Sequence, residues 1–383
     1  MRVMLLALTA ALCGPAVAEV ALRVVSFNTF QGIDNAPADR EASGNLLTSL
    51  DLDGGGPNTS LRPDVVCLQE CRSLGDMQDF RDDFLPGWQV IKGAFTDGFN
   101  SNGFFIRPEL SVLSLAELST PGPRRVLRLA LDVPDAATPL VIYNAHFKAG
   151  QTSADRATRE AEANAIANRV AADVISGIDF NDDRIPDLFP THYLFAGDLN
   201  HDDFNGVTID ALLVGGSSGN PTGLNDTRFE TLVGAGTTTF FIGDTFSTRS
   251  GLDSRYDYIL SSDAIFATFD TNGDQSVDQA ELNAAGFVYN SFDDAGAQAS
   301  GDVDATNRAS DHAPVVLGLT LPGVGIPGDV DGDGDVDLTD LSLLLGAFGA
   351  TQGQPGYNPD ADLDGDGDVD LTDAAILLSH FGE

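Results

Sequence analysis

Residues 193–200 read Tyr-Leu-Phe-Ala-Gly-Asp-Leu-Asn, an apolar run that ends in two polar residues, Asp198 and Asn200. A short apolar run of this length, bounded by Gly, is typical of a buried strand. Polar side chains at the end of such a strand lie at the rim of a sheet, where side chains from other strands can join them. The segment therefore predicts a functional site at one end of a sheet.

Five further segments carry polar residues at or next to a short apolar run in the same way. These residues are Asn28 after 24–27, Glu70 after 65–69, His146 at the end of 141–146, Asp257 within 255–260, and Asp311 with His312 before 313–316. Each segment alone would arise by chance. Together they predict that side chains distant in the sequence share one rim.

The surrounding sequence alternates short strands with few helices. The β-rich runs are 22–27, 64–68, 102–106, 127–133, 140–146, 193–197, 256–260 and 314–321. Apolar and other residues alternate over Leu127–Val133, which predicts a half-buried strand. The clearest helix is Ala154–Ile175, where Ile166, Val170 and Val174 recur every four residues. Many strands with few helices indicate stacked sheets covered by helices.

In this order, and with Ser-Asp-His-Ala-Pro at 310–314, the six segments resemble the endonuclease/exonuclease/phosphatase superfamily. That superfamily includes pancreatic-type deoxyribonucleases, abasic-site endonucleases, inositol polyphosphate phosphatases and bacterial sphingomyelinases. The resemblance covers residues 19–321 and implies an α/β (α+β) fold, a four-layer sandwich of two β-sheets flanked by helices. It also implies hydrolysis of a phosphoester with the help of a divalent metal ion.

The resemblance implies Glu70 as the principal metal ligand, with Asn28 and Asp311 close by. Carboxylate and amide oxygens suit Mg²⁺ or Mn²⁺. Asn200 would stabilise the developing charge. His146 is a candidate acid toward the leaving group, although on its own it also fits a half-buried histidine.

The general base is not decided by the sequence. Asp198 would orient or deprotonate the attacking water, and His312 would contact the phosphate or take the water's proton. Asp257 would hold His312 in the required tautomer, as a carboxylate does in hydrolytic triads. Asp257 could instead form a structural ion pair with Arg255.

The last part of the chain, 328–383, contains an internal repeat, because the segment 329–340 recurs at 362–373. Each copy has the spacing of a twelve-residue calcium loop, with Gly334 or Gly367 at the sharp turn. The expected calcium ligands are Asp329, Asp331, Asp333, Asp335, Asp337 and Asp340, and Asp362, Asp364, Asp366, Asp368, Asp370 and Asp373. Asp335 and Asp368 would contribute only their backbone carbonyls.

An apolar helical stretch follows each calcium loop. The tandem loop-helix arrangement resembles a dockerin, a small all-α, EF-hand-like domain. Asp at the twelfth loop position fits dockerins better than ordinary EF-hands. Dockerins imply a cohesin-like scaffold as partner.

A third segment, 270–281, has the same spacing but carries Gln275 at the turn position. Its expected ligands are Asp270, Asn272, Asp274, Ser276, Asp278 and Glu281. We interpret it as a further calcium loop, with a polar surface insertion as the alternative. The cluster Asp179, Asn181, Asp183 and Asp187 is looser and favours a solvated loop.

The formal net charge of the 383-residue chain is −38, which disfavours tight binding to polyanions unless cations intervene.

Residues 1–18 have the basic, apolar and Ala-x-Ala parts of a signal peptide, which predicts secretion to the extracellular space or a periplasm. Cys67 and Cys71 are expected to be free, mostly buried thiols. Residues 322–327 are rich in Pro and Gly and are expected to form a linker. No other apolar run approaches the length of a membrane span.

We therefore expect a secreted metal-dependent phosphoesterase. Among the possible activities, a nuclease or general phosphodiesterase ranks first. A phosphatase or a sphingomyelinase-like phospholipase is the alternative, with Thr239–Ile242 as a thin candidate for a membrane-contacting aromatic segment. A hypothesis of another class is a calcium-dependent scaffold-binding protein whose main function lies in the dockerin-like tail.

Overall fold

The computed structural model describes residues 19–29, 32–33, 37–48, 63–200, 212, 222, 224–226, 256–288, 310, 312 and 314–382. The chain divides into two compact units. The larger contains Ala21–Pro134 and Thr138–Leu321, and the smaller contains Pro322–Glu383. Among the described residues, no helix is both long and apolar enough to cross a bilayer.

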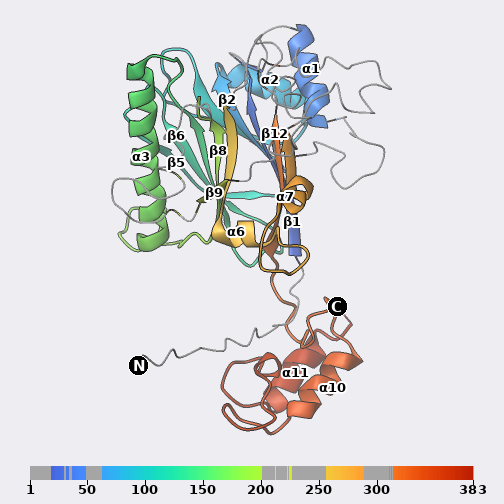
Figure 1. The fold of residues 1–383 in the computed structure, drawn as a ribbon. Helices are drawn as coiled ribbons and strands as arrows, with labels where there is room; N and C mark the ends of the chain where they lie inside the picture. The colour runs from blue at the N-terminus through green and yellow to red at the C-terminus, as the bar shows by residue number, and fades with distance from the viewer. Residues whose placement is uncertain are drawn as a thin grey trace, which may run out of the picture. The chain divides into compact units, whose positions relative to one another are not determined.

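The larger unit is built on two six-stranded mixed sheets that face each other (Figure 1). Sheet 1 runs, in spatial order, β11 (Gly286–Val288), β12 (Val315–Pro322), β1 (Glu19–Asn28), β2 (Val65–Cys71), β4 (Ser101–Ile106) and β3 (Gln89–Lys92). Sheet 2 runs β5 (Ser111–Leu118), β6 (Val126–Asp132), β7 (Leu140–His146), β8 (His192–Asp198), β10 (Asp257–Ser262) and β9 (Leu224–Asp226).

Helices cover the outer face of each sheet. On sheet 1, α1 (Pro37–Thr48) and α2 (Leu74–Phe84) pack their apolar residues against β1, β2, β4 and β12. On sheet 2, α3 (Ser153–Ser176) packs against the central strands. Two short helices, α6 (Asp263–Ala267) and α7 (Gln279–Ala285), follow β10. The order helix, sheet, sheet, helix is the expected four-layer sandwich, so the predicted fold class is confirmed.

One expectation about the strands is wrong. Strand β6 is not half-buried: Arg128 and Ala130, expected on an exposed face, are buried, and only Asp132 is exposed. Ala130 packs in the core beneath α3, and the Arg128 guanidinium pairs with Asp173 of that helix at 2.9 Å. Helix α3 therefore covers the face that the alternation predicted to be open to solvent.

The two cysteines Cys67 and Cys71 are both free and buried, as expected. Burial raises the pKa of Cys71 to about 12 and that of Cys67 further, so both stay protonated thiols.

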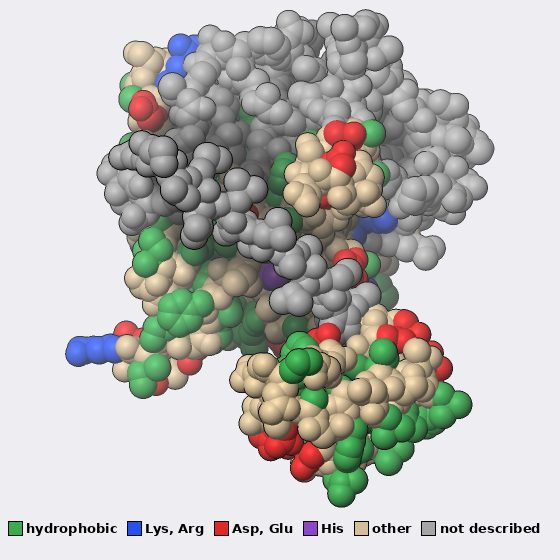
Figure 2. All heavy atoms as spheres, turned by 60° about the horizontal axis from the view of Figure 1, so that its bottom comes forward, with side chains coloured by type: hydrophobic (Ala, Val, Ile, Leu, Met, Phe, Trp, Pro, Cys, Tyr) green, Lys and Arg blue, Asp and Glu red, His purple; other side chains and the backbone are tan. Residues whose placement is uncertain are grey.

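The smaller unit consists of two loop-helix repeats. Its elements are α10 (Leu338–Ala347), the 3₁₀ turn η2 (Pro359–Ala361) and α11 (Leu371–Ser379). The repeats are joined by equivalent backbone hydrogen bonds, Gly349 N to Val369 O and Gly382 N to Val336 O, both 2.8 Å. They share one small core in which Val336, Val369, Leu344 and Leu377 take part. Acidic side chains gather at two separate places on this unit (Figure 2).

Candidate functional site

The predicted rim residues come from both sheets and meet between them. Asn28 ends β1 and Asp198 ends β8, and the Asn28 amide donates a hydrogen bond to Asp198 Oδ2 at 2.9 Å. The same Nδ2 lies 3.5 Å from Glu70 Oε1. Because β1 and β2 are parallel, Asn28 and Glu70 lie at the same end of sheet 1.

Glu70 lies in an irregular part of β2. The pairing of β2 with β4 shifts register between Leu68 and Cys71, and Glu70 has a left-handed φ of 62°. A bulge of this kind redirects a side chain away from the regular alternation of a strand. A left-handed conformation is strained for a residue with a Cβ, and the strain is retained where surrounding contacts impose it.

His312 completes the site from the segment that precedes β12. Its Nδ1 shares a 2.6 Å hydrogen bond with Asp257 Oδ2, and its Nε2 lies 3.9 Å from Asp198 Oδ2. Ser310 holds the segment in place, because its hydroxyl donates to Asn28 O at 2.6 Å and accepts from His312 N at 3.1 Å. Asp198, Asp257 and His312 offer ligand atoms within 4.8 Å of one another.

His146 enters the same site from the end of β7. Its Nε2 lies 3.5 Å from Asp198 Oδ2, while its buried Nδ1 has no hydrogen-bond partner among the described residues. Burial lowers the pKa of His146 well below its ordinary value, and Arg124 and His312 act in the same direction. The imidazole is therefore neutral at neutral pH.

Asp198 is the central carboxylate of the site. Burial raises the pKa of Asp198, the charge of Asp257 adds to the rise, and His312 opposes it. Its Oδ1 accepts the backbone N–H of Asn200 at 2.7 Å. A carboxylate with a raised pKa is a better proton acceptor than an ordinary aspartate.

Asn200 has a left-handed φ of 49°, and its side-chain amide donates to Phe147 O at 3.2 Å. Phe147 N in turn donates to Asp198 O at 2.9 Å. Asn200 therefore joins the end of β8 to the residue that follows His146.

The donor set fits a hard divalent cation. The Asn28 amide and the Glu70 carboxylate are neighbours, with Asn28 Nδ2 3.5 Å from Glu70 Oε1, and carboxylate and amide oxygens are ligands that such an ion accepts. Asp257 Oδ1 is buried without a hydrogen-bond partner among the described residues. The site therefore has at least one acceptor oxygen that a bound ion, water or substrate could contact. Two predicted features, Asp311 and Arg255, lie outside the described residues.

Sequence reasoning missed two buried residues behind the site, Gln69 and Asn144. Gln69 Nε2 donates to Asn144 Oδ1 at 2.8 Å, which links β2 of one sheet to β7 of the other. The sequence does contain a signal for both residues, because each is an amide side chain inside an otherwise apolar strand.

A rim of aromatic and arginine side chains also escaped the sequence analysis. The 93–100 connection between β3 and β4 carries Phe95 and Phe99, which are 44% and 74% exposed. The guanidinium of Arg125 lies 4.5 Å from the centre of the Phe95 ring, and Arg124 pairs with Asp97 at 2.9 Å.

This rim, Phe95, Phe99, Arg124 and Arg125, borders the site. Arg124 Nη1 donates to the carbonyl of Phe147, next to His146, at 3.1 Å. Ser101, two residues after Phe99, pairs with Cys71, next to Glu70.

The segment 270–281 has the same internal hydrogen bonds as the loop 329–340. In the latter, Asp329 accepts N–H bonds from Gly332 and Gly334, at 2.7 and 3.1 Å. The equivalent Asp270 accepts from Gly273 and Gln275, at 2.8 and 2.7 Å.

The last residue of each loop closes it in the same manner. Glu281 Oε1 accepts from Thr271 N and Asn272 N, and Asp340 Oδ1 accepts from Val330 N and Asp331 N. The surface segment 179–187 repeats the first half of this pattern, with Asp179 accepting from Asp182 N and Arg184 N, and it closes earlier, because Asp187 Oδ2 accepts from Phe180 N.

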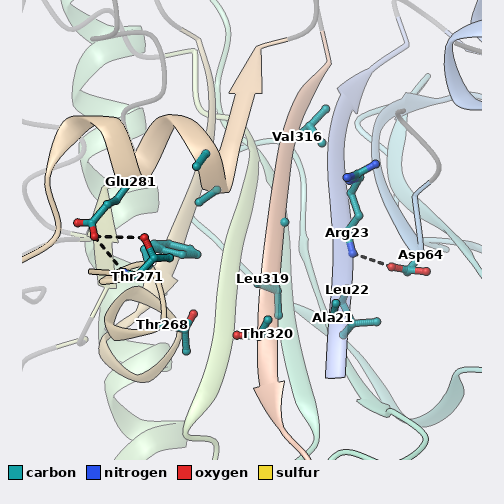
Figure 3. A pocket seen from close by; sticks show the side chains of 14 residues that line it. Ala21, Leu22, Arg23, Asp64, Thr268, Thr271, Glu281, Val316, Leu319 and Thr320 are labelled. Carbon is teal, nitrogen blue, oxygen red and sulfur yellow. Dashed lines mark hydrogen bonds between the residues drawn. The ribbon is translucent and has the colours of Figure 1, made fainter. Parts of the chain in front are cut away.

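A pocket of about 510 Å³ lies on the outer face of sheet 1 (Figure 3). Glu281 and Thr271 lie on one side of it, and Arg23 and Asp64 lie on the other. Arg23 is five residues before Asn28 on β1, roughly 16 Å along the strand. The pocket is therefore separate from the site that contains Asn28.

The fold and this site define a class of protein. Residues 25–312 match the family model "Endonuclease/Exonuclease/phosphatase family", and residues 327–381 match "Dockerin type I domain". The chain belongs to the endonuclease/exonuclease/phosphatase family, which contains metal-dependent phosphoester hydrolases, and it carries a C-terminal dockerin domain.

Solved structures are similar to this chain at low identity. Truncated TDP2 of Caenorhabditis elegans is 14% identical, with a TM-score of 0.48, covering 78% of this chain and 97% of that one. An endonuclease/exonuclease/phosphatase family protein of Bacteroides thetaiotaomicron is 15% identical, with a TM-score of 0.46 and coverages of 80% and 97%. The human Nocturnin catalytic domain is 14% identical, with a TM-score of 0.46 and coverages of 80% and 97%. No curated protein matches the chain.

Proposed function

We propose that the protein is a secreted, divalent-metal-dependent nuclease or phosphodiesterase that hydrolyses P–O bonds and docks through its C-terminal domain. The observation that carries the catalytic part is the convergence of Asn28, Glu70, Asp198 and the Asp257–His312 pair between the ends of two sheets. Hydrolysis of a phosphoester needs a cation at the phosphoryl oxygens, an activated water and a proton for the leaving group.

Glu70 and Asn28 would hold the cation, with Asp311 as a third ligand. Their oxygen donors favour Mg²⁺ or Mn²⁺. When bound, the ion supplies positive charge that offsets the charge developing on the phosphoryl oxygens.

Asp198 is the best-placed general base. Its raised pKa favours proton uptake, and hydrogen bonds from Asn28 and Asn200 fix its two oxygens. His312, held by Asp257 through Nδ1, presents Nε2 toward Asp198 and would contact a phosphoryl oxygen. The neutral His146 would donate a hydrogen bond toward the leaving group, and Asn200 would support the developing charge.

The exposed rim favours a nucleotide-containing substrate. Aromatic faces stack on bases without sequence preference, and arginines beside them add charge for the phosphates. Phe99 and the Phe95–Arg125 pair offer this chemistry next to Glu70 and His146. The alternative, a phosphatase or sphingomyelinase-like phospholipase, had Thr239–Ile242 as its sequence feature, and that segment lies outside the described residues.

The test is hydrolysis by the mature protein with Mg²⁺, Mn²⁺, Ca²⁺ or chelator. The panel is plasmid DNA, RNA, bis-p-nitrophenyl phosphate, p-nitrophenyl phosphate and sphingomyelin. We expect metal-dependent turnover of the diesters that is lost in Glu70→Ala and His312→Ala. Phe99→Ala should raise KM for the nucleic acids but not for bis-p-nitrophenyl phosphate. Turnover of sphingomyelin or p-nitrophenyl phosphate alone would favour the alternative.

The C-terminal domain would bind two calcium ions in 329–340 and 362–373 and dock on a cohesin-like scaffold. Leu338 and Leu371 occupy equivalent positions at the starts of α10 and α11 and are 71% and 74% exposed. Two equivalent apolar positions are consistent with two equivalent docking faces. If a cohesin pull-down with calcium recovers no partner at micromolar concentration, docking on a cohesin is contradicted. If the pull-down does recover a cohesin but hydrolysis fails on the whole panel, the scaffold-binding hypothesis becomes the main one.

A third calcium ion would occupy 270–281, because this loop repeats the hydrogen bonds of 329–340. The residues at its ligand positions are Asp270, Asn272, Asp274, Ser276, Asp278 and Glu281.

Secretion rests on the signal sequence at 1–18, which lies outside the described residues. Expression in a secreting host, followed by N-terminal sequencing of the mature protein, tests cleavage before Glu19.

A further inference from the structure

A chain of buried amides crosses the interior between the two sheets, where a sandwich is ordinarily apolar. Asn144 on β7 is its centre and is 0% exposed. Its Nδ2 donates to Leu68 O at 3.1 Å and to Gly103 O at 2.8 Å, on β2 and β4 of the opposite sheet. Its Oδ1 accepts from Gln69 Nε2 at 2.8 Å. Asn144 therefore makes three side-chain hydrogen bonds across the sandwich.

These contacts fall at the place where the β2–β4 ladder breaks. Leu68 and Gly103 are the last regularly paired residues before the bulge, and the pairing resumes only at Cys71 with Ser101. A bulge leaves backbone groups unpaired, and a buried unpaired carbonyl is costly. Asn144 supplies donors to the carbonyls of both residues.

The bulge determines where Glu70 points. Glu70 lies between Gln69, which Asn144 holds by its side chain, and Cys71, where pairing resumes. Its φ of 62° would relax toward the regular strand if the bulge were not fixed. Asn144 is also two residues before His146 on β7, so the same residue ties the Glu70 side of the site to the His146 side.

We propose that Asn144 is the positioning residue for Glu70: by fixing the β2 bulge from the opposite sheet, it sets the metal-binding geometry of the site. This inference rests on the proposed role of Glu70 as metal ligand. Residues that orient metal ligands, without touching the metal, commonly change its affinity by about 10- to 100-fold when replaced.

The test uses the full-length mature protein and two variants at this position. Asn144→Asp keeps the acceptor for Gln69 and removes both donors to the carbonyls. Asn144→Leu, of similar size, removes all three hydrogen bonds. Mn²⁺ binding is measured without substrate by electron paramagnetic resonance, with calcium present to saturate the calcium loops. We expect the Mn²⁺ Kd to rise about 10- to 100-fold in both variants. We also expect kcat to recover at high Mn²⁺ and KM for the substrate to stay unchanged.

Tyr143→Phe is the matched control. Tyr143 is the neighbouring residue on β7, is equally buried, and its hydroxyl donates to Asp173 at 2.8 Å on the opposite face of the strand. It should lower thermal stability and leave the Mn²⁺ Kd unchanged. If Asn144→Leu fails to fold, Gln69→Leu, which leaves both carbonyl contacts intact, takes its place with a smaller expected rise in Kd.

The Glu70→Ala variant distinguishes the positioning role of Asn144 from the proposed role of Glu70 as metal ligand. If Glu70→Ala abolishes Mn²⁺ binding while the folded Asn144 variants bind Mn²⁺ like the parent protein, the positioning role is overturned. If Glu70→Ala also leaves Mn²⁺ binding intact, the assignment of Glu70 as metal ligand fails instead. Weaker binding in the Asn144 variants alongside an unchanged Tyr143→Phe supports the inference.

Discussion

The side chains of Asp257 and His312 form a 2.6 Å hydrogen bond that joins the two sheets of the sandwich. Asp257 begins β10 of sheet 2, and His312 precedes β12 of sheet 1. Both side chains are almost completely buried. Because Asp257 Oδ2 accepts from Nδ1, the hydrogen bond leaves Nε2 of His312 turned toward Asp198. The pair therefore sets both the tautomer and the direction of the imidazole.

Replacing Asp257 with Asn should lower kcat by about 10²- to 10⁴-fold, the range for loss of a group that supports proton transfer or charge at a reacting centre. The amide keeps the size of the side chain but removes the negative charge that stabilises a protonated His312 and selects its tautomer. Steady-state kinetics with the preferred phosphodiester measure the effect. A kcat within threefold of the parent enzyme, with unchanged folding, would contradict the role.

Glu162 of α3 is buried at 0% exposure beside the segment that follows His146. Its Oε2 accepts the backbone N–H of Lys148 at 2.8 Å, and its Oε1 has no hydrogen-bond partner among the described residues. Burial raises the pKa of Glu162 from 4.5 to about 7, although Lys148, Arg124 and Arg159 oppose the rise. Between these values the folded chain holds a proton that the unfolded chain has released.

Stability should therefore fall as pH rises from about 4.5 to 7 and be constant above this window, as far as Glu162 contributes. Gln at position 162 stays neutral at every pH. As pH rises from about 4.5 to 7, the free energy of unfolding of Glu162→Gln should therefore increase by about 3 kcal/mol relative to that of the parent protein. Urea unfolding at pH 5 and pH 8 measures this difference. Glu160→Gln, on the exposed side of the same helix, should show no such gain. Parallel pH curves for the parent and Glu162→Gln would refute the expectation.

Much of the architecture follows from local sequence, because the strands that form the site are apolar runs with polar ends. Strand Leu140–His146 agrees with the predicted range at both ends, and α3 extends the predicted helix by one residue at each end. The polar end residues Asn28, Glu70 and Asp198 do converge. The period of a strand and the polarity of its last residue are both local properties, so one sequence suffices.

What the sequence did not supply depends on contacts between distant segments. Strand β6 was expected to be half-buried, because its alternation cannot reveal that α3 covers the second face. Helix α2 was missed, although Ser73 caps it and Met77 and Phe80 are buried three residues apart. The role of Asn144 depends on a bulge in a strand of the other sheet. Such relationships exist only after the two sheets have packed.

Gln275 has a left-handed φ of 68°, whereas Gly334 and Gly367 occupy the equivalent position in the C-terminal loops, with φ of 95° and 94°. A left-handed conformation costs a residue with a Cβ about 1–2 kcal/mol. Glycine avoids this cost, but its higher conformational entropy in the unfolded chain offsets part of the gain. Gln275→Gly should therefore raise the free energy of unfolding in calcium by about 1 kcal/mol. Denaturant unfolding measures it. Ser276→Gly, at the next residue, should destabilise the protein, and a loss of stability in Gln275→Gly would count against the strain.

Calcium should be required for the C-terminal unit to stay folded. In the loop 329–340, the charge of Asp333 raises the pKa of Asp335. The pKa of Asp331 is also raised, first by burial and then by the charges of its acidic neighbours. This repulsion between carboxylates is relieved only when a cation binds. Calorimetry of the full-length protein in calcium should show a transition of this unit that disappears with chelator, while that of the larger unit remains.

A single ligand change should have the same effect on both repeats. Asp340 is fully buried, and its carboxylate accepts three backbone N–H groups of its own loop, from Val330, Asp331 and Asp337. The loops share one core, and Gly349 and Gly382 hydrogen-bond across the repeats, so opening one loop removes support from the other. Asp340→Ala should thus abolish the calorimetric transition in calcium, whereas Asp360→Ala, outside both loops, should keep it. Survival of a calcium-stabilised half in Asp340→Ala would show that the repeats fold independently.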